Sequence, residues 1–203
     1  VVSTSKEGSA QSDPFVGKKI PPMPASPPDL SKVRFRLPTS IFNGKDLTGW
    51  RPNESDKISG WSVKDGGLVN ATPKTDFSST GAYANLRTKA VYKDFWLHIE
   101  FLIPNKGGNS GVYLQNRYEI QVLDGDKTKH GMAAVINETP SPYHAYNGLG
   151  KWNAYDIVFR AARFKDGKLS EKAKVSMYFN GTKVHTTITI NHVRGGKTSA
   201  PAG

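Results

Sequence analysis

The segment Asn109–Asp124 constrains the fold more than any other part of the chain, because apolar and polar side chains alternate along both of its arms. A period of two is the pattern of a β-strand with one buried face. We therefore predict a β-hairpin with an apolar face and a polar face. The apolar positions are Val112, Leu114, Ile120 and Val122, and the polar positions are Tyr113, Gln115, Glu119 and Gln121.

The loop of this hairpin is predicted to contain three residues, 116–118. Only an odd number of loop residues aligns the apolar side chains of one arm with those of the other, since a slip of one residue moves every side chain to the opposite face. This register sets Gln115 opposite Glu119 and Tyr113 opposite Gln121.

The polar face of the predicted hairpin has the composition of a sugar-binding surface. Planar amides and carboxylates hydrogen-bond to hydroxyl groups, and a tyrosine ring stacks on a sugar. A simply solvated outer face is the alternative, because many antiparallel strands have one. Such faces usually carry Lys, Thr and Ser in place of Tyr, Gln and Glu.

The rest of the chain also predicts β-structure, because short alternating runs are separated by turn signals and helical periodicity of useful length is missing. This pattern favours an all-β sandwich. The predicted strands and hairpins are Phe95–Ile103, Asn153–Arg160, a hairpin around Asp65–Gly67, and a hairpin of 173–179 with 183–190 around Asn180-Gly181.

Three regions are predicted along the 203 residues. Residues 1–40 carry six prolines between Pro21 and Pro38 and are predicted to form an extended Pro-rich arm or linker. Residues 41–194 are predicted to form the domain, and residues 195–203 a flexible tail. The arm is either a disordered leader or a strap over the domain or a neighbour. The strap would make a homo-oligomer or a partner chain possible, with Phe15, Ile20, Met23 and Phe35 as its anchors.

Composition excludes several classes of protein. The chain has no cysteine, which rules out disulfides and thiolate metal sites, and it has no apolar run near the roughly 20 residues of a transmembrane helix. Its net charge of +11 is scattered along the sequence. Because no helix and no aromatic-glycine motif concentrates this charge, no specific nucleic-acid partner is expected.

Several motifs of the chain occur together in the order known from one family. These are Phe42–Trp50 (FNGKDLTGW), Asn109–Tyr113, Tyr118–Asp124, Gly150–Asn153 and Asn180-Gly181. The ordered set resembles the 3-keto-disaccharide hydrolase domain family, long catalogued as a domain of unknown function. The resemblance implies a concanavalin A-like jelly-roll sandwich of two curved antiparallel sheets. It also implies cleavage of glycosides that carry a 3-ketone, and a periplasmic or extracellular bacterial location, with attachment to the cell surface as one form of it.

The end of the chain departs from the pattern of this family. Family domains usually continue into a Gly-Pro-Ile-x-Leu-Gln-Asp-His-Gly-type strand and a final strand, whereas this sequence ends in GGKTSAPAG. We expect that the remaining strands are supplied by a separate polypeptide, or that the sequence is incomplete.

Three residues are candidates for catalysis. A 3-ketone acidifies the hydrogen on carbon 2, so the reaction needs a general base and a donor near the leaving oxygen. Glu119 is the candidate base; its alternative role is an ion pair with Arg117 or a lysine. His98 and His144 are the candidate titrating partners.

The candidate substrate-binding residues share hydrogen-bonding or stacking side chains. They are Asn109, Tyr113, Gln115, Gln121, Asp124, Tyr143, Trp152 and Asn153. For Trp152 a core wedge and for Asn153 a turn fastener are the alternatives. No metal or cofactor is expected, because no His-x-His or His-x-x-x-His spacing occurs; calcium at Asp124, Asp126 and backbone carbonyls is the alternative.

Two other functions remain open at this point. A non-catalytic carbohydrate-binding module would use the same polar face without a base, and a structural or assembly protein of the cell surface would use the sandwich as a scaffold. In the enzymatic interpretation the ligand is a small-molecule glycoside or oligosaccharide.

Overall fold

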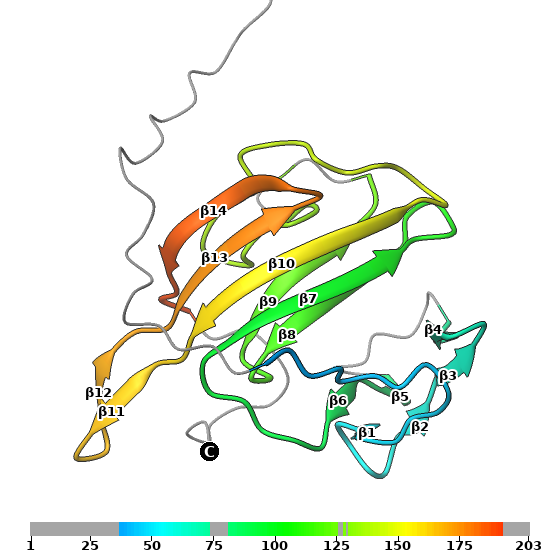
Figure 1. The fold of residues 1–203 in the computed structure, drawn as a ribbon, viewed down its shortest axis with the longest axis horizontal. Helices are drawn as coiled ribbons and strands as arrows, with labels where there is room; N and C mark the ends of the chain where they lie inside the picture. Colours follow the sequence, from blue (N-terminus) through cyan, green and yellow to red (C-terminus); the bar gives the residue numbers. More distant parts are fainter. Residues whose placement is uncertain (1–36, 74–80, 126–127, 129, 193–203) are drawn as a thin grey trace, which may run out of the picture. The chain divides into compact units, whose positions relative to one another are not determined.

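The computed structural model describes residues 37–73, 81–125, 128 and 130–192, and every regular element in them is a β-strand (Figure 1). The chain divides into two units, Val1–Thr39 and Ser40–Gly203, and all strands belong to the second. The predicted all-β sandwich is confirmed. The predicted arm, except for residues 37–40, and the predicted tail lie outside the described residues. Within the described part no helix is long and apolar enough to span a membrane.

A four-stranded antiparallel sheet forms one layer of the sandwich. Its order is β14-β13-β10-β7, with β7 at Phe95–Leu102, β10 at Trp152–Arg160, β13 at Lys174–Phe179 and β14 at Thr182–Thr189. Alternation along β10 places Tyr155, Ile157 and Phe159 on the inner face, where they are at most 1% exposed. The strand predicted over Asn153–Arg160 is confirmed.

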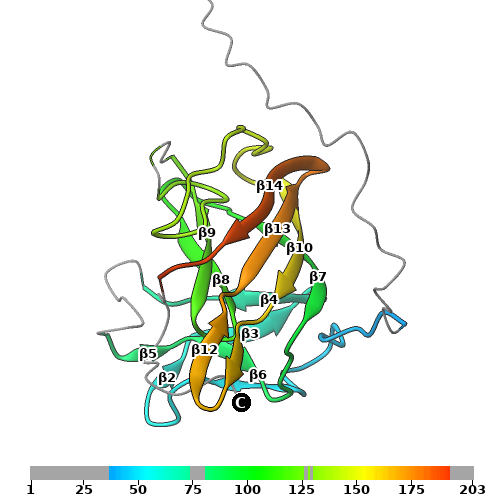
Figure 2. The same ribbon diagram turned by 90° about the vertical axis from the view of Figure 1, so that its left-hand side faces the viewer.

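The hairpin of β8 (Asn109–Leu114) and β9 (Tyr118–Leu123) forms the second layer against this inner face (Figures 1 and 2). Leu114 and Ile120 are buried between the layers, and each large apolar side chain removed from water contributes roughly 1.5–3 kcal/mol. The Tyr118 ring packs 5.8 Å from that of Phe159, centroid to centroid. The Tyr155 hydroxyl donates a 2.7 Å hydrogen bond to the Gln121 carbonyl and so joins the layers directly.

The buried segment 131–136 covers the edge of β9 that faces away from β8. The Gln121 amide donates to the Ala134 carbonyl, and the Ile136 amide donates to the Glu119 carbonyl, both at 3.0 Å. His185 of β14 lies 2.7 Å from the Ala133 carbonyl through Nε2. Burial lowers the pKa of His185, so its neutral ring donates this bond. The segment therefore connects the hairpin to the far edge of the sheet.

Four pairs of short strands complete the domain. The β2–β5 pair is parallel, which departs from the antiparallel pairing of the other strands. The turn of the β3–β4 hairpin is Asp65-Gly66, with φ of 51° and 76°, as its sequence predicts. The pairs are β1 (Trp50–Pro52) with β6 (Leu86–Thr88), β2 (Ile58–Ser59) with β5 (Tyr83–Ala84), β3 (Trp61–Lys64) with β4 (Gly67–Asn70), and β11 (Arg163–Lys165) with β12 (Lys168–Glu171).

The β13–β14 turn is Asn180-Gly181, as predicted, and its asparagine also organises a neighbouring loop. Both residues have positive φ, 48° and 79°, which a tight hairpin turn of this kind requires. Asn180 accepts a hydrogen bond from the Ala154 amide and donates one to Asn153 Oδ1, both at 2.8 Å. Asn153 is 2% exposed, and its side chain also bonds to the Asn147 amide and the Lys151 carbonyl.

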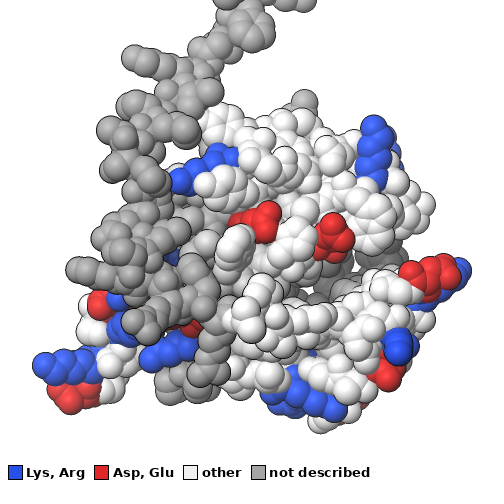
Figure 3. Space-filling model, in the orientation of Figure 1, with Lys and Arg blue, Asp and Glu red and all other residues white. Residues whose placement is uncertain are grey.

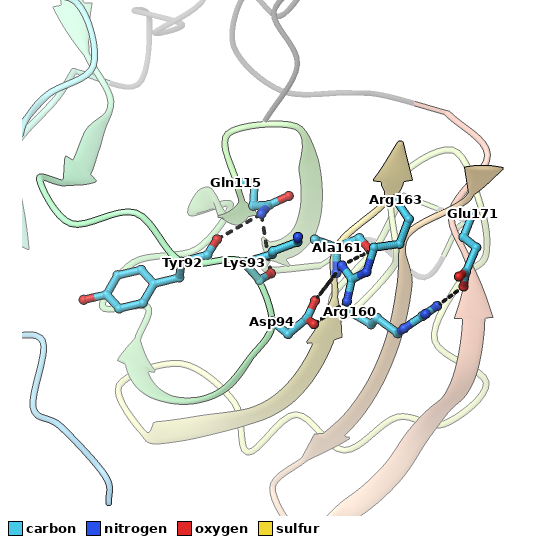
Figure 4. A network of polar contacts seen from close by, with 8 residues as sticks. All are labelled: Tyr92, Lys93, Asp94, Gln115, Arg160, Ala161, Arg163 and Glu171. Carbon is cyan, nitrogen blue, oxygen red and sulfur yellow. Dashed lines mark hydrogen bonds and ion pairs between the residues drawn. The ribbon is translucent and has the colours of Figure 1, made fainter. Parts of the chain in front are cut away.

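Charged and amide side chains hold the segment that leads into β7 (Figure 4). The Asp94 carboxylate accepts hydrogen bonds from the Ala161 amide at 2.8 Å and from both terminal nitrogens of Arg163. Burial opposes ionisation of Asp94, but these donors outweigh it and hold the pKa below its ordinary value of 3.8. Asp94 thus ties the start of β7 to the end of β10.

We expect Asn153→Ala to lower the free energy of unfolding by about 2–3 kcal/mol, because buried partners of the amide would lose their hydrogen bonds. Urea unfolding followed by circular dichroism measures this change. Asn105→Ala, at an exposed turn, is the matched control and should stay within about 0.5 kcal/mol of the parent. A loss at Asn153 no larger than that at Asn105 would contradict the structural role.

We expect the Asp94 clamp to stabilise the fold above about pH 5 and to weaken as pH falls through the lowered pKa. The sign follows because a carboxyl with a depressed folded-state pKa loses its contribution on protonation. Since Asp94 is half-exposed, Asp94→Asn should cost only about 0.5–1 kcal/mol near pH 7 and less near pH 3, where more of the carboxyl is protonated. Urea unfolding at both pH values checks this. An equal cost at both would show that charge is irrelevant.

Candidate active site

The polar face of the β8–β9 hairpin carries Gly111, Tyr113, Glu119 and Gln121. The register pairs Tyr113 with Glu119 and Gly111 with Gln121, so these four positions share one face. The apolar partners on the other face, Val112 with Ile120 and Leu114 with Tyr118, point to the core. The predicted separation into an apolar and a polar face is therefore confirmed.

The predicted register itself was wrong by one step. The loop is Gln115–Arg117, not 116–118, and Leu114 pairs with Tyr118. Gln115 and Asn116 have φ of 54° and 57°, which belongs to a turn and not to a strand. Both loops contain three residues, so the shift preserves which residues share a face but removes Gln115 from the polar face.

Gln115 instead fastens the hairpin turn to the segment before β7. Its Nε2 donates to the Tyr92 carbonyl at 2.9 Å and to the Lys93 carbonyl at 3.4 Å (Figure 4). The neighbouring Asn116 donates to Asn53 Oδ1 at 3.3 Å. Gln115 is therefore not one of the residues of the proposed substrate site.

Glu119 lies directly over Gly111, and this contact was not anticipated from the sequence. A Cβ atom at Gly111 would come within 2.5 Å of Glu119 Oε1 and 3.0 Å of its Cγ. Because Gly111 has no side chain, the Glu119 carboxylate can occupy this position on the half-buried polar face. A glycine inside a strand often marks a close approach of this kind, which was the available signal.

Gln121 borders the same carboxylate and is 7% exposed. Its backbone is fixed on both sides by the 131–136 segment and by Tyr155. The side-chain Oε1 is buried and has no hydrogen-bond partner within the described part of the chain. A buried polar atom without a partner is costly, and a donor such as a hydroxyl would satisfy it.

A second group of predicted residues gathers at the open end of the hairpin. Asp124 follows β9, and its Oδ2 accepts a 3.0 Å hydrogen bond from the Gly107 amide. Burial and the nearby Asp124 carboxylate raise the pKa of Tyr146. The His144 ring meets that of Tyr146 edge-on at 6.4 Å, and Asn109 begins β8 as the partner of Leu123 at this end.

The neighbouring candidates Tyr143, Asn153 and Trp152 have different surroundings. Tyr143 packs against the core, and the bonds of Asn153 described above use its amide within the protein. We therefore leave both out of the proposed site. Trp152 is not a core wedge: it is 61% exposed on the outer face of the four-stranded sheet.

His98 does not share a face with Glu119. Its strand β7 pairs with β10, and alternation directs His98 to the outer face of that sheet, away from the hairpin layer. There its Nδ1 lies 2.8 Å from Asp156 Oδ1. His98, predicted as a titrating partner of Glu119, therefore lies on a different face from it. The partner Asp156, which was not among the predicted site residues, lies directly opposite it across the strands.

Two further observations bear on ligands. In the described part of the chain no group of three or more His, Cys, Asp or Glu side chains is placed to hold a metal ion, and Asp126 lies outside that part. A surface depression of about 400 Å³ lies elsewhere, among residues 40–43, 48–49, 88–90 and 92, and none of the predicted site residues lines it.

The arrangement on the polar face supports proton transfer. A carboxylate, a phenol and an amide lie side by side on two paired strands, which hold them more rigidly than a loop would. A carboxylate can remove a proton, and a phenol or amide can donate a hydrogen bond to the oxygen on which charge develops.

Comparison with known proteins supports the family suggested by the sequence. The chain matches the model of the 3-keto-alpha-glucoside-1,2-lyase-like domain over residues 37–201. A 3-keto-disaccharide hydrolase from Bacteroides thetaiotaomicron is 27% identical over 161 residues, which cover 72% of this chain and 54% of that protein. The chain thus spans about half the length of this relative.

Two crystal structures from Parabacteroides distasonis, each provisionally named a glycosyl hydrolase, share the fold. The first has a TM-score of 0.62 at 24% identity and covers 89% of this chain and 87% of its own. The second has a TM-score of 0.53 at 23% identity, with coverage of 74% and 72%. Because the family model covers residues 37–201, well over half of the sequence, the chain belongs to the 3-keto-alpha-glucoside-1,2-lyase-like domain family.

Proposed function

We propose that this chain cleaves 3-keto-glycosides by general acid–base chemistry on the polar face, with Glu119 as the base. The observation that carries the proposal is the position of the Glu119 carboxylate over Gly111, between Tyr113 and Gln121. Membership of the family and the name of the Bacteroides relative support the choice of substrate class. Action on glycosides would suit a periplasmic or extracellular location.

The reaction proceeds by elimination followed by addition of water. Glu119 takes the proton from carbon 2, and the electron pair of that bond forms a double bond between carbons 1 and 2. The bond from carbon 1 to the leaving oxygen breaks, and that oxygen takes up a proton. Water then adds as hydroxyl to carbon 1 and proton to carbon 2, which gives the 3-keto sugar.

The neighbours of Glu119 have distinct positioning roles in this scheme. Tyr113 lies opposite Glu119 across the strands, so its hydroxyl is suited to donate toward the enolate oxygen or the leaving oxygen. The orphaned Gln121 Oε1 is suited to accept a hydrogen bond from a sugar hydroxyl. Asp124, Asn109 and His144 at the open end of the hairpin would contact the leaving group.

Non-catalytic binding of carbohydrate is the second candidate function, because the same tyrosine, glutamine and glutamate suit recognition of hydroxyl groups without chemistry. Release of aglycone separates the two candidates. The remaining alternative, a structural or assembly protein, depends on the Pro-rich arm, which lies outside the described residues.

We expect Glu119→Gln to lower the rate of aglycone release from a 3-keto-glucoside by at least about 100-fold, because loss of a general base typically costs a factor of 10²–10⁴. A chromogenic 3-keto-glycoside and its unoxidised parent are the substrates, and only the former should react. Glu171→Gln, on the exposed hairpin β11–β12, is the control and should keep full activity. An active Glu119→Gln variant would exclude the proposed base.

We expect Gly111→Ala to reduce the same activity by about 100-fold, because the added methyl group would displace the Glu119 carboxylate. Gly67→Ala is the matched control: it also lies in a strand, and its Cβ would meet its nearest atom at an ordinary 3.6 Å. Steady-state kinetics with thermal unfolding of each variant distinguishes displacement of the carboxylate from loss of the fold. Unchanged kcat in Gly111→Ala would show that the carboxylate position is unimportant.

A further inference from the structure

The outer face of the four-stranded sheet exposes large aromatic side chains that the proposed reaction does not use. Trp96 and Trp152 are each 61% exposed and Tyr178 is 40% exposed. Val158, directly opposite Trp96, is 43% exposed. Contiguous exposed apolar groups on one face of a soluble domain commonly mark a binding surface. We call this surface the aromatic face; its members are Trp96, His98, Glu100, Trp152, Asp156 and Tyr178.

The strand register fixes the spacing of the aromatic rings. Trp152 is the partner of Leu102, which lies six residues along β7 from Trp96, so the two indoles are separated by about 20 Å. Tyr178 lies on the neighbouring strand, opposite Asp156. The Lys183 ammonium is 5.8 Å from the centre of the Tyr178 ring and helps to hold it. The two tryptophans thus mark the ends of a span whose length suits a short oligosaccharide, and Tyr178 lies to one side of this span on β13.

Polar side chains occupy the space between the two indoles. His98 Nδ1 lies 2.8 Å from Asp156 Oδ1, and its Nε2 lies 3.9 Å from Glu100 Oε1. The Asp156 carboxylate therefore orients the imidazole, and the Glu100 carboxylate lies near its other nitrogen. Ala154 is the partner of Glu100 across the strands, and its small side chain leaves a shallow region in the middle of the aromatic face. Ring platforms at the ends and hydrogen-bonding groups at the centre match the alternating apolar and hydroxyl surfaces of a sugar chain.

The charge of this face selects among ligands. Figure 3, which views the molecule in the orientation of Figure 1, shows acidic side chains in the middle of a largely uncharged surface and basic ones at its margins. Glu100 and Asp156 would repel a polyanion, despite the net charge of +11 of the chain. A second protein surface would have to bury both carboxylates, which is costly without cationic partners. A neutral glycan hydrogen-bonds to them instead.

From these observations we propose that the aromatic face is a second carbohydrate site, which binds a neutral oligosaccharide or polysaccharide chain along β7 and β10. Trp96 and Trp152 stack on sugar rings at the two ends, and the His98–Asp156 pair holds hydroxyl groups between them. This site lies on the opposite side of the sandwich from the polar face, so it binds its ligand independently of catalysis.

Affinity electrophoresis in native gels that contain soluble neutral polysaccharides (β-glucan, xyloglucan, galactomannan or amylopectin) tests the proposal. The parent protein should be retarded by at least one of them. Trp96→Ala and Trp152→Ala should each weaken the association at least about 10-fold, since each substitution removes one of the two rings that stack on the sugar chain. Phe164→Ala, at an exposed aromatic residue of β11 away from this face, is the matched control and should bind as the parent does.

Several outcomes would overturn the proposal. These are failure of every neutral polysaccharide to retard the parent protein, retardation that survives both tryptophan substitutions, or a dimer that these substitutions dissociate in size-exclusion chromatography. His98→Ala removes a hydrogen-bonding side chain from the middle of the aromatic face and provides a second measurement. It should weaken polysaccharide binding less than the tryptophan substitutions do. Glu119→Gln should bind normally, so loss of aglycone release and loss of polysaccharide binding are distinguishable failures.

Discussion

The hydrogen bond from the buried Tyr155 hydroxyl to the Gln121 carbonyl couples the two layers on which the candidate site depends. Tyr155 is fully buried on the inner face of the four-stranded sheet, and Gln121 belongs to the hairpin that covers that face. The bond fixes the backbone at Gln121, and the 131–136 segment fixes it from the other edge. Alternation along β9 then presents Glu119 on the polar face. The position of the candidate base Glu119 is thus a consequence of the core packing behind it.

Local alternation was sufficient to predict the longer strands β7–β10, β13 and β14 and most of their side-chain faces, but not the pairing of the hairpin residues. Loops 115–117 and 116–118 both contain three residues, so both place Val112 and Ile120 in the core. The choice between them depends on tertiary contacts: Gln115 gains the Tyr92 and Lys93 carbonyls only if it lies in the turn. The parallel β2–β5 pair was missed because strands of two residues carry too little pattern to be recognised.

The predicted catalytic group was divided by topology, which the sequence does not specify. Glu119 and His98 each lie in an alternating strand at a polar position, and nothing local shows which strands are neighbours. Because β7 pairs with β10, His98 meets Asp156 on the outer face, whereas Glu119 stays on the hairpin. Asp124, His144 and Tyr146 meet at a third place, through the loop before β10. We assign the base to the first of these groups, because its carboxylate lies beside the phenol and amide of the hairpin's polar face.

Two carbohydrate surfaces on opposite sides of one sandwich would have different tasks. A short glycoside held at the polar face cannot extend through the buried core to the aromatic face, so the two surfaces do not share one small ligand. A polymer bound along β7 and β10 would instead retain the protein near a source of glycosides and raise their effective concentration at Glu119, as linked binding sites generally do. Weak polysaccharide binding at the aromatic face is then sufficient, because it needs only to prolong the time that the protein stays on the polymer. This division would give a role to the large side chains that the outer face of the sheet exposes.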